Sequence, residues 1–191
     1  MHTAPHHLTS AELELGLDDV LASPQNEGRL EAIVARPARD ERRALATAQV
    51  TPEAGLAGDR WNRSGHYKLP DGQPDPKNQL SLMNARILRQ IAGHEAAVCL
   101  SGDNLIVDFD LGEANLPAGS RLAIGVQAVI EITAHPHSGC DKFSARYGKD
   151  ARAFINDRRV KQLHLRGRFA RVVAGGTIAV GDAIRKVGDT S

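Results

Sequence analysis

RFARVVAGGTIAVGDAIRKV (168–187) is the stretch of sequence that decides the fold. It divides into three short apolar runs, RFARVV, TIAV and AIRKV, which are separated by the dipeptides Gly-Gly and Gly-Asp. Short runs rich in valine and isoleucine are typical of strands, and these dipeptides between them favour tight hairpin turns. The stretch therefore predicts three consecutive strands at 168–173, 177–180 and 183–187.

Further strands are predicted upstream of this stretch. The segment 122–133 places Val126, Ala128, Ile130 and Ile132 on one face, which is the period of a strand with one buried side. Similar patterns predict strands at 28–36, 45–50, 80–83 and 104–111.

A few short helices accompany these strands. Thr9 and Glu12 have the spacing of a capping box, and Gly93 is a typical helix stop. The predicted helices run from Thr9 or Ser10 to before Pro24, from the capping residue Asn84 to Ala92, and over 150–156. Many short strands with few helices predict a mainly β fold, a closed or nearly closed β-barrel.

The length of 191 residues suits one domain with an appended arm. We expect a helical arm at 1–27, the barrel at 28–187 and a short tail at 188–191. The segment 60–79 is rich in glycine, proline and asparagine, and long loops of this kind are lids, binding loops or plain insertions. The sequence leaves the choice between a lid and an insertion open.

Composition excludes several classes of protein. The net charge of +1 argues against a dedicated nucleic-acid binder, and no apolar stretch reaches the roughly 18–20 residues of a membrane helix. The N-terminus lacks the pattern of a secretory signal. Two cysteines are too few for a disulfide scaffold or for an iron–sulfur cluster held by this chain alone. We therefore expect a cytoplasmic protein whose partners are neither nucleic acids nor membranes.

Cys140, in the run HPHSGCDKF (135–143), is the strongest candidate for a chemical centre. It follows a predicted strand in a loop with Gly139, close to His137 and Lys142, where a thiol is exposed and its thiolate favoured. Three chemistries are open to it: metal ligand, sulfur carrier or nucleophile. The structural alternative, a small buried hydrophobe, suits Cys99 in AAVCL better.

The neighbouring histidines give weaker signals. His135, His137 and Cys140 form an HxHxxC array, but no second pair of zinc ligands stands at a recognisable spacing. A Cys–His hydrolase is weaker still, because nothing identifies an oxyanion hole or an orienting asparagine.

Basic residues are concentrated after Cys140. The segment 142–171 contains ten Lys or Arg residues against Asp150 and Asp157. It is either a solvated face or a pocket for a small anion, since Arg forks match phosphate oxygens. Nucleic acid is the weakest alternative, because stacking aromatics do not interleave the charges.

Asp59, in the glycine-spaced run GLAGDRW (55–61), also has two interpretations. It either bonds nearby backbone N–H groups in a turn or lies where a slim backbone approaches a ligand. The sequence does not separate them.

Several segments, taken together and in order, resemble a MOSC domain, the C-terminal domain of molybdenum-cofactor sulfurases and its stand-alone relatives. The resemblance covers about 28–187, and its most specific parts are an early G-x-x-G-D, a lone central cysteine and a late G-G-x-I-x-x-G-D. The segments are GLAGDRW (55–61), QLSLMNARIL (79–88), GDNLIVDFDL (102–111), LPAGSRLAIG (116–125), VIEIT (129–133), PHSGCDKF (136–143) and LRGRFARVVAGGTIAVGD (165–182).

The resemblance implies a β-barrel of the type found in the small domain of pyruvate kinase. It also implies that Cys140 carries sulfur or ligates molybdenum in a bound molybdenum cofactor, whose pterin bears a phosphate. The basic side chains expected to hold that phosphate are Lys142, Arg146, Arg166 and Arg168, and further cofactor-binding candidates are Asp59, Arg60 and His137.

The sequence also departs from larger relatives. It contains no pyridoxal-phosphate-dependent sulfurase domain, accessory N-terminal barrel or ferredoxin module, so pyridoxal phosphate enters only as a family association. We expect sulfur or electrons to come from a partner, either a sulfur-transfer protein or an external electron donor. Trp61 stands where the family often has histidine after G-D-R, which leaves the role of that position open.

Three functional hypotheses follow. In the first, the chain binds the molybdenum cofactor through Cys140 and reduces small N-hydroxylated or N-oxide compounds, by family analogy. In the second, it is a sulfur-carrier or cofactor-binding module that uses a Cys140 persulfide without turnover. In the third, the barrel binds a phosphorylated small molecule or partner, and Cys140 is incidental.

Overall fold

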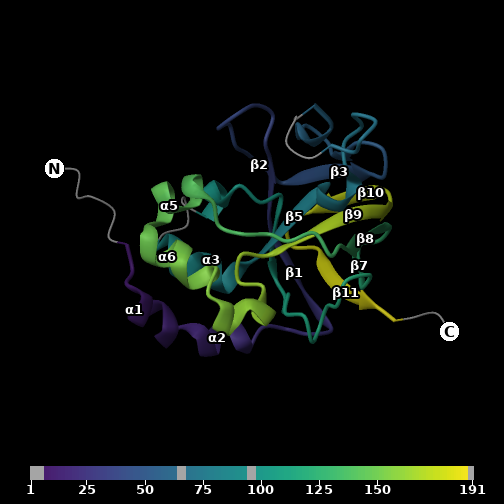
Figure 1. Cartoon of the computed structure of the whole chain (residues 1–191). Coiled ribbons are helices and arrows are strands. Elements are labelled where there is room, and N and C mark those ends of the chain that lie inside the picture. Colours follow the sequence, from purple (N-terminus) through teal and green to yellow (C-terminus); the bar gives the residue numbers. More distant parts are fainter. Residues whose placement is uncertain (1–6, 64–67, 94–97, 189–191) are drawn as a thin grey trace.

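Seven strands form a closed barrel in the computed structural model, which describes residues 7–63, 68–93 and 98–188. In chain order the barrel strands are β1 (Glu27–Ala35), β5 (Leu80–Asn84), β6 (Leu105–Asp108), β7 (Arg121–Ile124), β8 (Ala128–Ile132), β9 (Arg168–Ala174) and β11 (Ala183–Val187). They pair in the order β11-β7-β8-β9-β5-β6-β1, and β1 pairs with β11 to close the ring (Figure 1). Only β5 and β6 run parallel among these pairs. The predicted fold class is confirmed.

Smaller strands extend one end of the barrel. β2 (Arg43–Leu45) pairs with β1, while β10 (Gly176–Ala179), β3 (Thr47–Thr51) and β4 (Gly55–Leu56) form a separate three-stranded sheet. The predicted strand at 45–50 is therefore two strands, and the one at 104–111 is shorter than expected.

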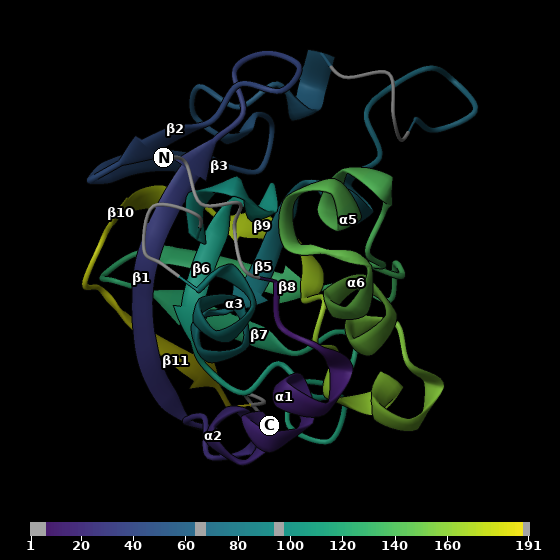
Figure 2. The same ribbon diagram turned by 90° about the vertical axis from the view of Figure 1, so that its left-hand side faces the viewer.

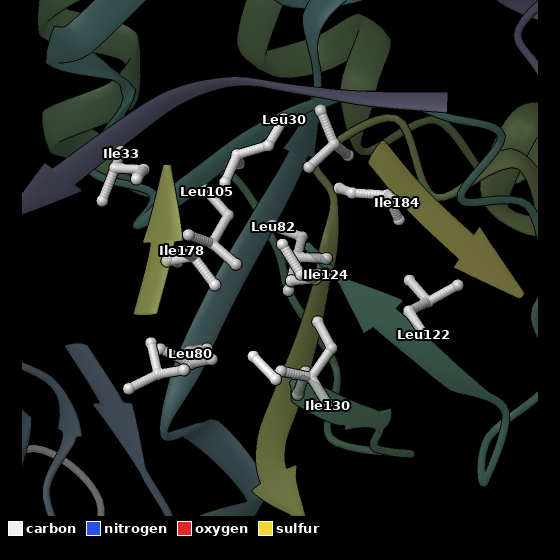
Figure 3. Packing of buried hydrophobic residues seen from close by; sticks show 14 of the residues in the cluster. Leu30, Ile33, Leu80, Leu82, Leu105, Leu122, Ile124, Ile130, Ile178 and Ile184 are labelled. Carbon is white, nitrogen blue, oxygen red and sulfur yellow. The ribbon is translucent and has the colours of Figure 1, made fainter. Parts of the chain in front are cut away.

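Aliphatic side chains fill the barrel. Leu30, Leu82, Leu122, Ile130 and Ile184 are fully buried and converge on its interior (Figure 3). Burial of aliphatic area is the main source of stability for such a core. The barrel core explains how a chain with 4% aromatic residues folds.

Helices gather on one side of the barrel (Figures 1 and 2). They are α1 (Ser10–Leu15), α2 (Leu17–Leu21), α3 (Ala85–Ala92), α5 (Asp141–Tyr147) and α6 (Lys149–Ile155). Short 3₁₀ turns are η1 (Trp61–Arg63), η2 (Pro76–Asn78), η3 (Cys99–Ser101) and η4 (Arg158–Leu163). A second apolar cluster, which includes Leu13, Leu88 and Phe143, packs this layer together. No helix in the described part of the chain is long and apolar enough to cross a membrane.

The helix caps agree with the sequence. Thr9 and Glu12 form the predicted capping box, Asn84 caps α3, and Gly93 ends it. The first predicted helix is nevertheless two helices that meet at Gly16, where Gln90 of α3 lies beside the glycine and donates to the carbonyl of Leu13 at 3.0 Å. Both short helices pack on the domain, against α3 and α6.

The three strands predicted at 168–187 exist, but they do not form hairpins with one another. β9 pairs with β5 and β8, β10 pairs with β3, and β11 pairs with β1 and β7. The glycines instead mark corners where the chain crosses between sheets. A Cβ on Gly176 would lie 2.9 Å from the backbone nitrogen of Ala128, so the crossing depends on close backbone approach.

The single strand predicted at 122–133 is also wrong. It is a hairpin of β7 and β8, and Val126 at its turn is 97% exposed, whereas Ala128, Ile130 and Ile132 are buried as expected. Gly125, with φ +61°, was the signal for the turn.

A substitution at Gly28 tests the close packing of the strands where the barrel closes. This glycine lies on β1 between β6 and β11, and a Cβ there would lie 2.0 Å from the carbonyl oxygen of Asp108. We expect Gly28→Ala to lower the free energy of unfolding by about 1–3 kcal/mol through overpacking. Urea denaturation measures this, with Gly188→Ala as control because that Cβ meets nothing within 4 Å. Equal losses in the two variants would contradict the assignment.

Candidate functional site

One pocket brings the predicted cysteine and most of the predicted basic residues together. Its volume is about 290 Å³, near the lower end of the range for small-molecule sites. This Cys140 pocket is lined by Arg36, Asp40, Arg42, Asp59, Arg60, Trp61, Asn78, Ser81, Ser101, Gly102, His137, Ser138, Cys140, Lys142, Phe143, Arg146, Arg166 and Phe169. Of the predicted site residues, only Arg168 is absent from its lining; it is buried and donates to Glu113 at 3.0 Å.

Two larger hollows, of about 730 and 710 Å³, lie elsewhere. Neither is lined by Cys140 or by the basic residues of its pocket. We therefore place the candidate site at the smaller pocket, where the reactive side chains converge.

Cys140 is exposed and immediately precedes α5. The loop predicted at Gly139 and Cys140 is therefore short, because α5 begins at Asp141; this helix was not predicted. Phe143 and Tyr147, four residues apart, are buried and tilted against one another with ring centroids 4.7 Å apart. This helical spacing was the overlooked signal. Cys99 is half-buried at the start of η3, so it is less buried than expected.

The position of Cys140 is set by a clamp on the preceding residue. Gly139 donates its N–H to Asn156 Oδ1 at 2.9 Å, and its carbonyl accepts from Asn156 Nδ2 and Arg152 Nε at 3.2 Å each. A Cβ on Gly139 would lie 2.9 Å from Ile155 Cδ1. A side chain at residue 139 would therefore displace the end of the Ile155 side chain, which glycine avoids where the loop lies against the end of α6.

Positive charge dominates the Cys140 pocket. Its lining holds six basic side chains against two carboxylates; the basic ones are Arg36, Arg42, Arg60, Lys142, Arg146 and Arg166. Lys142 and Arg146 both pair with Asp40. Burial, together with Arg146 and Arg36 nearby, lowers the pKa of Arg42. Like charges are thus crowded here, and an anion in the pocket would relieve their repulsion.

Asp59 fixes Arg36 at one wall. Its Oδ2 accepts from the backbone nitrogen of Arg36 at 2.9 Å and from Arg36 Nε at 2.8 Å, and its Oδ1 accepts from Arg36 Nη2 at 3.2 Å. Burial raises the pKa of Asp59, but the hydrogen bonds and charge of Arg36 outweigh it and hold the pKa below its usual value. Asp59 also accepts the backbone N–H of Trp61 at 2.9 Å, which is the turn chemistry weighed in the sequence analysis.

Arg166, which also lines the pocket, is likewise held by a buried carboxylate. Its Nη1 donates to both carboxylate oxygens of Asp103, at 2.9 and 2.8 Å. Burial raises the pKa of Asp103, but the charge and hydrogen bonds of Arg166 outweigh it and hold the pKa below its usual value. The guanidinium lies 5.1 Å from the ring centroid of Phe143, within cation–π range.

His137 is a buried imidazole on the pocket wall. Its ring centroid lies 4.2 Å from that of Phe169, and its Nε2 lies 3.8 Å from Asp103 Oδ1. Burial, followed by the charge of Arg166, lowers its pKa to about 3. The ring is therefore neutral at physiological pH and offers one donor and one acceptor nitrogen.

Four buried polar atoms on the pocket wall lack a hydrogen-bond partner among the described protein atoms. They are Arg42 Nε, Asn78 Nδ2, Arg166 Nε and His137 Nδ1. Unsatisfied buried polar atoms are costly and uncommon, so their gathering in one place marks a site for a polar ligand. Three of the four are donors, which favours an acceptor-rich ligand.

The sequence analysis missed Arg36, Arg42 and Asn78. They lie in segments whose local pattern carries no sign of function, and only the barrel brings them to Cys140. The histidine–cysteine array gains no support as a zinc site: among the described residues, no three His, Cys, Asp or Glu side chains gather to hold a metal ion.

Comparison with known families agrees with this architecture. A family model described as the MOSC domain matches residues 76–185, more than half of the chain. The chain belongs to the MOSC domain family. The resemblance stated from the sequence is thereby confirmed. Cys140 and Lys142 lie inside the matched range, whereas Asp59 precedes it.

Solved structures show the same fold. The YuaD protein from Bacillus subtilis is 18% identical, with a TM-score of 0.58, and the alignment covers 83% of this chain and 94% of that one. YiiM from Escherichia coli is also 18% identical, with a TM-score of 0.52 and coverage of 85% and 71%. At this identity the likeness concerns the fold alone. No curated protein matches the chain.

The clamp on Gly139 can be tested in this MOSC protein. We expect Asn156→Ala to remove both side-chain hydrogen bonds and lower the free energy of unfolding by about 1–3 kcal/mol, while amide exchange at Gly139 accelerates. Hydrogen exchange resolved by NMR measures the second effect. Gln162→Ala is the control, because within the described part of the chain its amide donates only to the exposed carbonyl of Arg159. Unchanged exchange at Gly139 in Asn156→Ala would refute the clamp.

The lowered pKa of His137 predicts how the free energy of unfolding depends on pH. The folded pKa of this residue is about 3 against an ordinary 6.5, so below pH 6.5 the unfolded chain binds a proton that the folded chain does not. The free energy of unfolding should therefore fall as pH decreases from 6.5 towards 3, by at most about 1.4 kcal/mol per pH unit from this residue. Denaturant titrations at several pH values measure the slope. His137→Gln should flatten it, and an identical slope would contradict the prediction.

Proposed function

We propose that this MOSC protein binds the molybdenum cofactor in the Cys140 pocket, with the Cys140 thiolate as a metal ligand. We further propose that it reduces small N-hydroxylated or N-oxide compounds with electrons from an external donor. The MOSC family is associated with the molybdenum cofactor. The observation that carries the proposal is an exposed thiol sharing one pocket with six basic side chains and three unpartnered buried donors.

The side chains present fit the cofactor. A thiolate is a soft ligand suited to such a metal, and Arg forks match the oxygens of a pterin phosphate. The unpartnered donors of Asn78 and Arg166 suit the acceptor atoms of a pterin ring. When bound, the cofactor supplies a redox-active metal for the removal of oxygen from the substrate.

The protein groups divide the remaining tasks. Lys142, Arg146 and Arg42 are the basic groups assigned to the phosphate, and Asp59 holds Arg36 ready beside them. Neutral His137 offers a hydrogen bond without adding charge. The Trp61 and Phe169 side chains contribute apolar wall that excludes water. We do not assign Arg168 to the phosphate, because it pairs with Glu113 outside the pocket.

Metal analysis tests this function. We expect protein from a host that makes the cofactor to hold molybdenum at near-stoichiometric level, and Cys140→Ser to lose it. Cys99→Ser is the matched control and should keep the metal, because Cys99 does not line the pocket. Wild-type protein without molybdenum would contradict the proposal.

Exposure of Cys140 gives the sulfur-carrier alternative some support, since a partner can reach the thiol. Metal-free protein that gains about 32 Da, one sulfur atom, on Cys140 after exposure to a cysteine desulfurase would favour that alternative instead.

A further inference from the structure

The basic residues around Cys140 favour the approach of anionic molecules to the thiol over that of cationic ones. Four basic residues, which we call the basic mouth, line the pocket with it: Arg42, Arg60, Lys142 and Arg146. Among the described residues, Asp40 is the one carboxylate that forms ion pairs with the basic mouth, and Lys142 and Arg146 share it. A concave, positively charged site raises the local concentration of small anions and lowers that of cations.

Buried donors point to a ligand independently of this charge. Asn78 is 5% exposed and Arg166 is 7% exposed; both line the Cys140 pocket, and each has a buried N–H donor without a partner among the described protein atoms. Such donors are satisfied by carboxylate or amide carbonyl oxygens. A molecule that matches both the basic mouth and these buried donors is therefore anionic and rich in hydrogen-bond acceptors.

We propose that Cys140 is a site of thiol–disulfide exchange selective for small anionic disulfides, with oxidised glutathione as the representative. Oxidised glutathione is negatively charged at neutral pH because its four carboxylates outnumber its two ammonium groups. Its carboxylates match the basic mouth, and its amide carbonyls match the donors of Asn78 and Arg166. The inference does not depend on the function proposed above.

The exchange balances without a further reagent. The Cys140 thiolate attacks one sulfur of the disulfide, a new S–S bond forms, and the old one breaks. One glutathione leaves as a thiolate and takes up a proton, so the Cys140 sulfur is oxidised while the departing sulfur is reduced. A Cys140 joined to glutathione has no free thiolate to bind a metal or to form a persulfide. The ratio of oxidised to reduced glutathione would therefore set the fraction of the protein whose Cys140 can do either.

Three disulfides of different charge test the selectivity: oxidised glutathione, neutral hydroxyethyl disulfide and cationic cystamine. Rates of modification are measured by intact mass on metal-free Cys99→Ser protein. Each rate is divided by that of the same disulfide with the urea-unfolded chain, which removes differences in intrinsic reactivity. We expect oxidised glutathione to exceed cystamine by about tenfold at low ionic strength. The ratio should fall towards one at 1 M salt, where the screening length is about 3 Å.

Reversing the charge of two basic-mouth residues tests whether the basic mouth causes the selectivity for anionic disulfides. Lys142→Glu with Arg146→Glu should reduce the ratio to about one or below, since two cations of the basic mouth become anions. Lys161→Glu is the matched control: Lys161 is an exposed lysine outside the pocket lining, and its reversal should leave the ratio unchanged. The salt dependence of the wild type provides the same information if the double variant does not fold.

Equal normalised rates for the three disulfides in the wild type would overturn the inference. So would selectivity that survives both 1 M salt and the double charge reversal. Molybdenum content is measured separately. A selective chain without metal therefore contradicts only the proposed function, and a metal-binding chain without selectivity contradicts only the exchange.

Discussion

The ion pair between half-buried Arg36 and buried Asp59 is the interaction on which the candidate site depends. It joins the end of β1 to the chain that enters η1, and Asn104 extends it to β5 by accepting from the backbone nitrogen of Ser81 at 3.1 Å. Four segments far apart in the sequence, around residues 36, 59, 81 and 104, are thereby fixed to one another. Losing either member of such a pair leaves an uncompensated charge in a poorly solvated place, which is strongly destabilising.

The pocket combines fixed and adaptable charges. Arg36 and Arg166 are each tied to a buried carboxylate by more than one hydrogen bond, so their positions are set before any ligand arrives. Lys142, in contrast, pairs with the exposed carboxylate of Asp40 and keeps the freedom of a long side chain, whereas Arg146 also donates to the carbonyl of Leu100 at 2.7 Å. Arg36 and Arg166 therefore shape the pocket wall, and Lys142 can follow an anion as it enters.

The sequence predicted those features that depend on residues close together in the chain, such as helix caps and the positions of short strands. Asn84 caps its helix as expected, and most of the short strands lie where their pattern placed them. Strand pairing depends on contacts across the barrel, which the local sequence does not reveal. The glycine dipeptides predicted as hairpin turns are therefore corners between sheets, and Val126, predicted on the buried face of a strand, lies in an exposed turn. Arg166 and Arg168 flank Gly167 and look equivalent in sequence, yet only the first lines the pocket. Asn78 could not be foreseen, since nothing near it indicates the pocket it lines.

The clamp between Gly139 and Asn156 means that the reactive sulfur and the barrel are supported by separate parts of the molecule. The thiol is positioned against the end of a surface helix, together with Lys142 and Arg146 of α5, whereas the other four cations of the pocket come from strand ends and loops. How the helix layer packs on the barrel therefore sets the distance between the sulfur and these four cations. Packing in the second apolar cluster thus matters to the chemistry of the thiol as well as to stability.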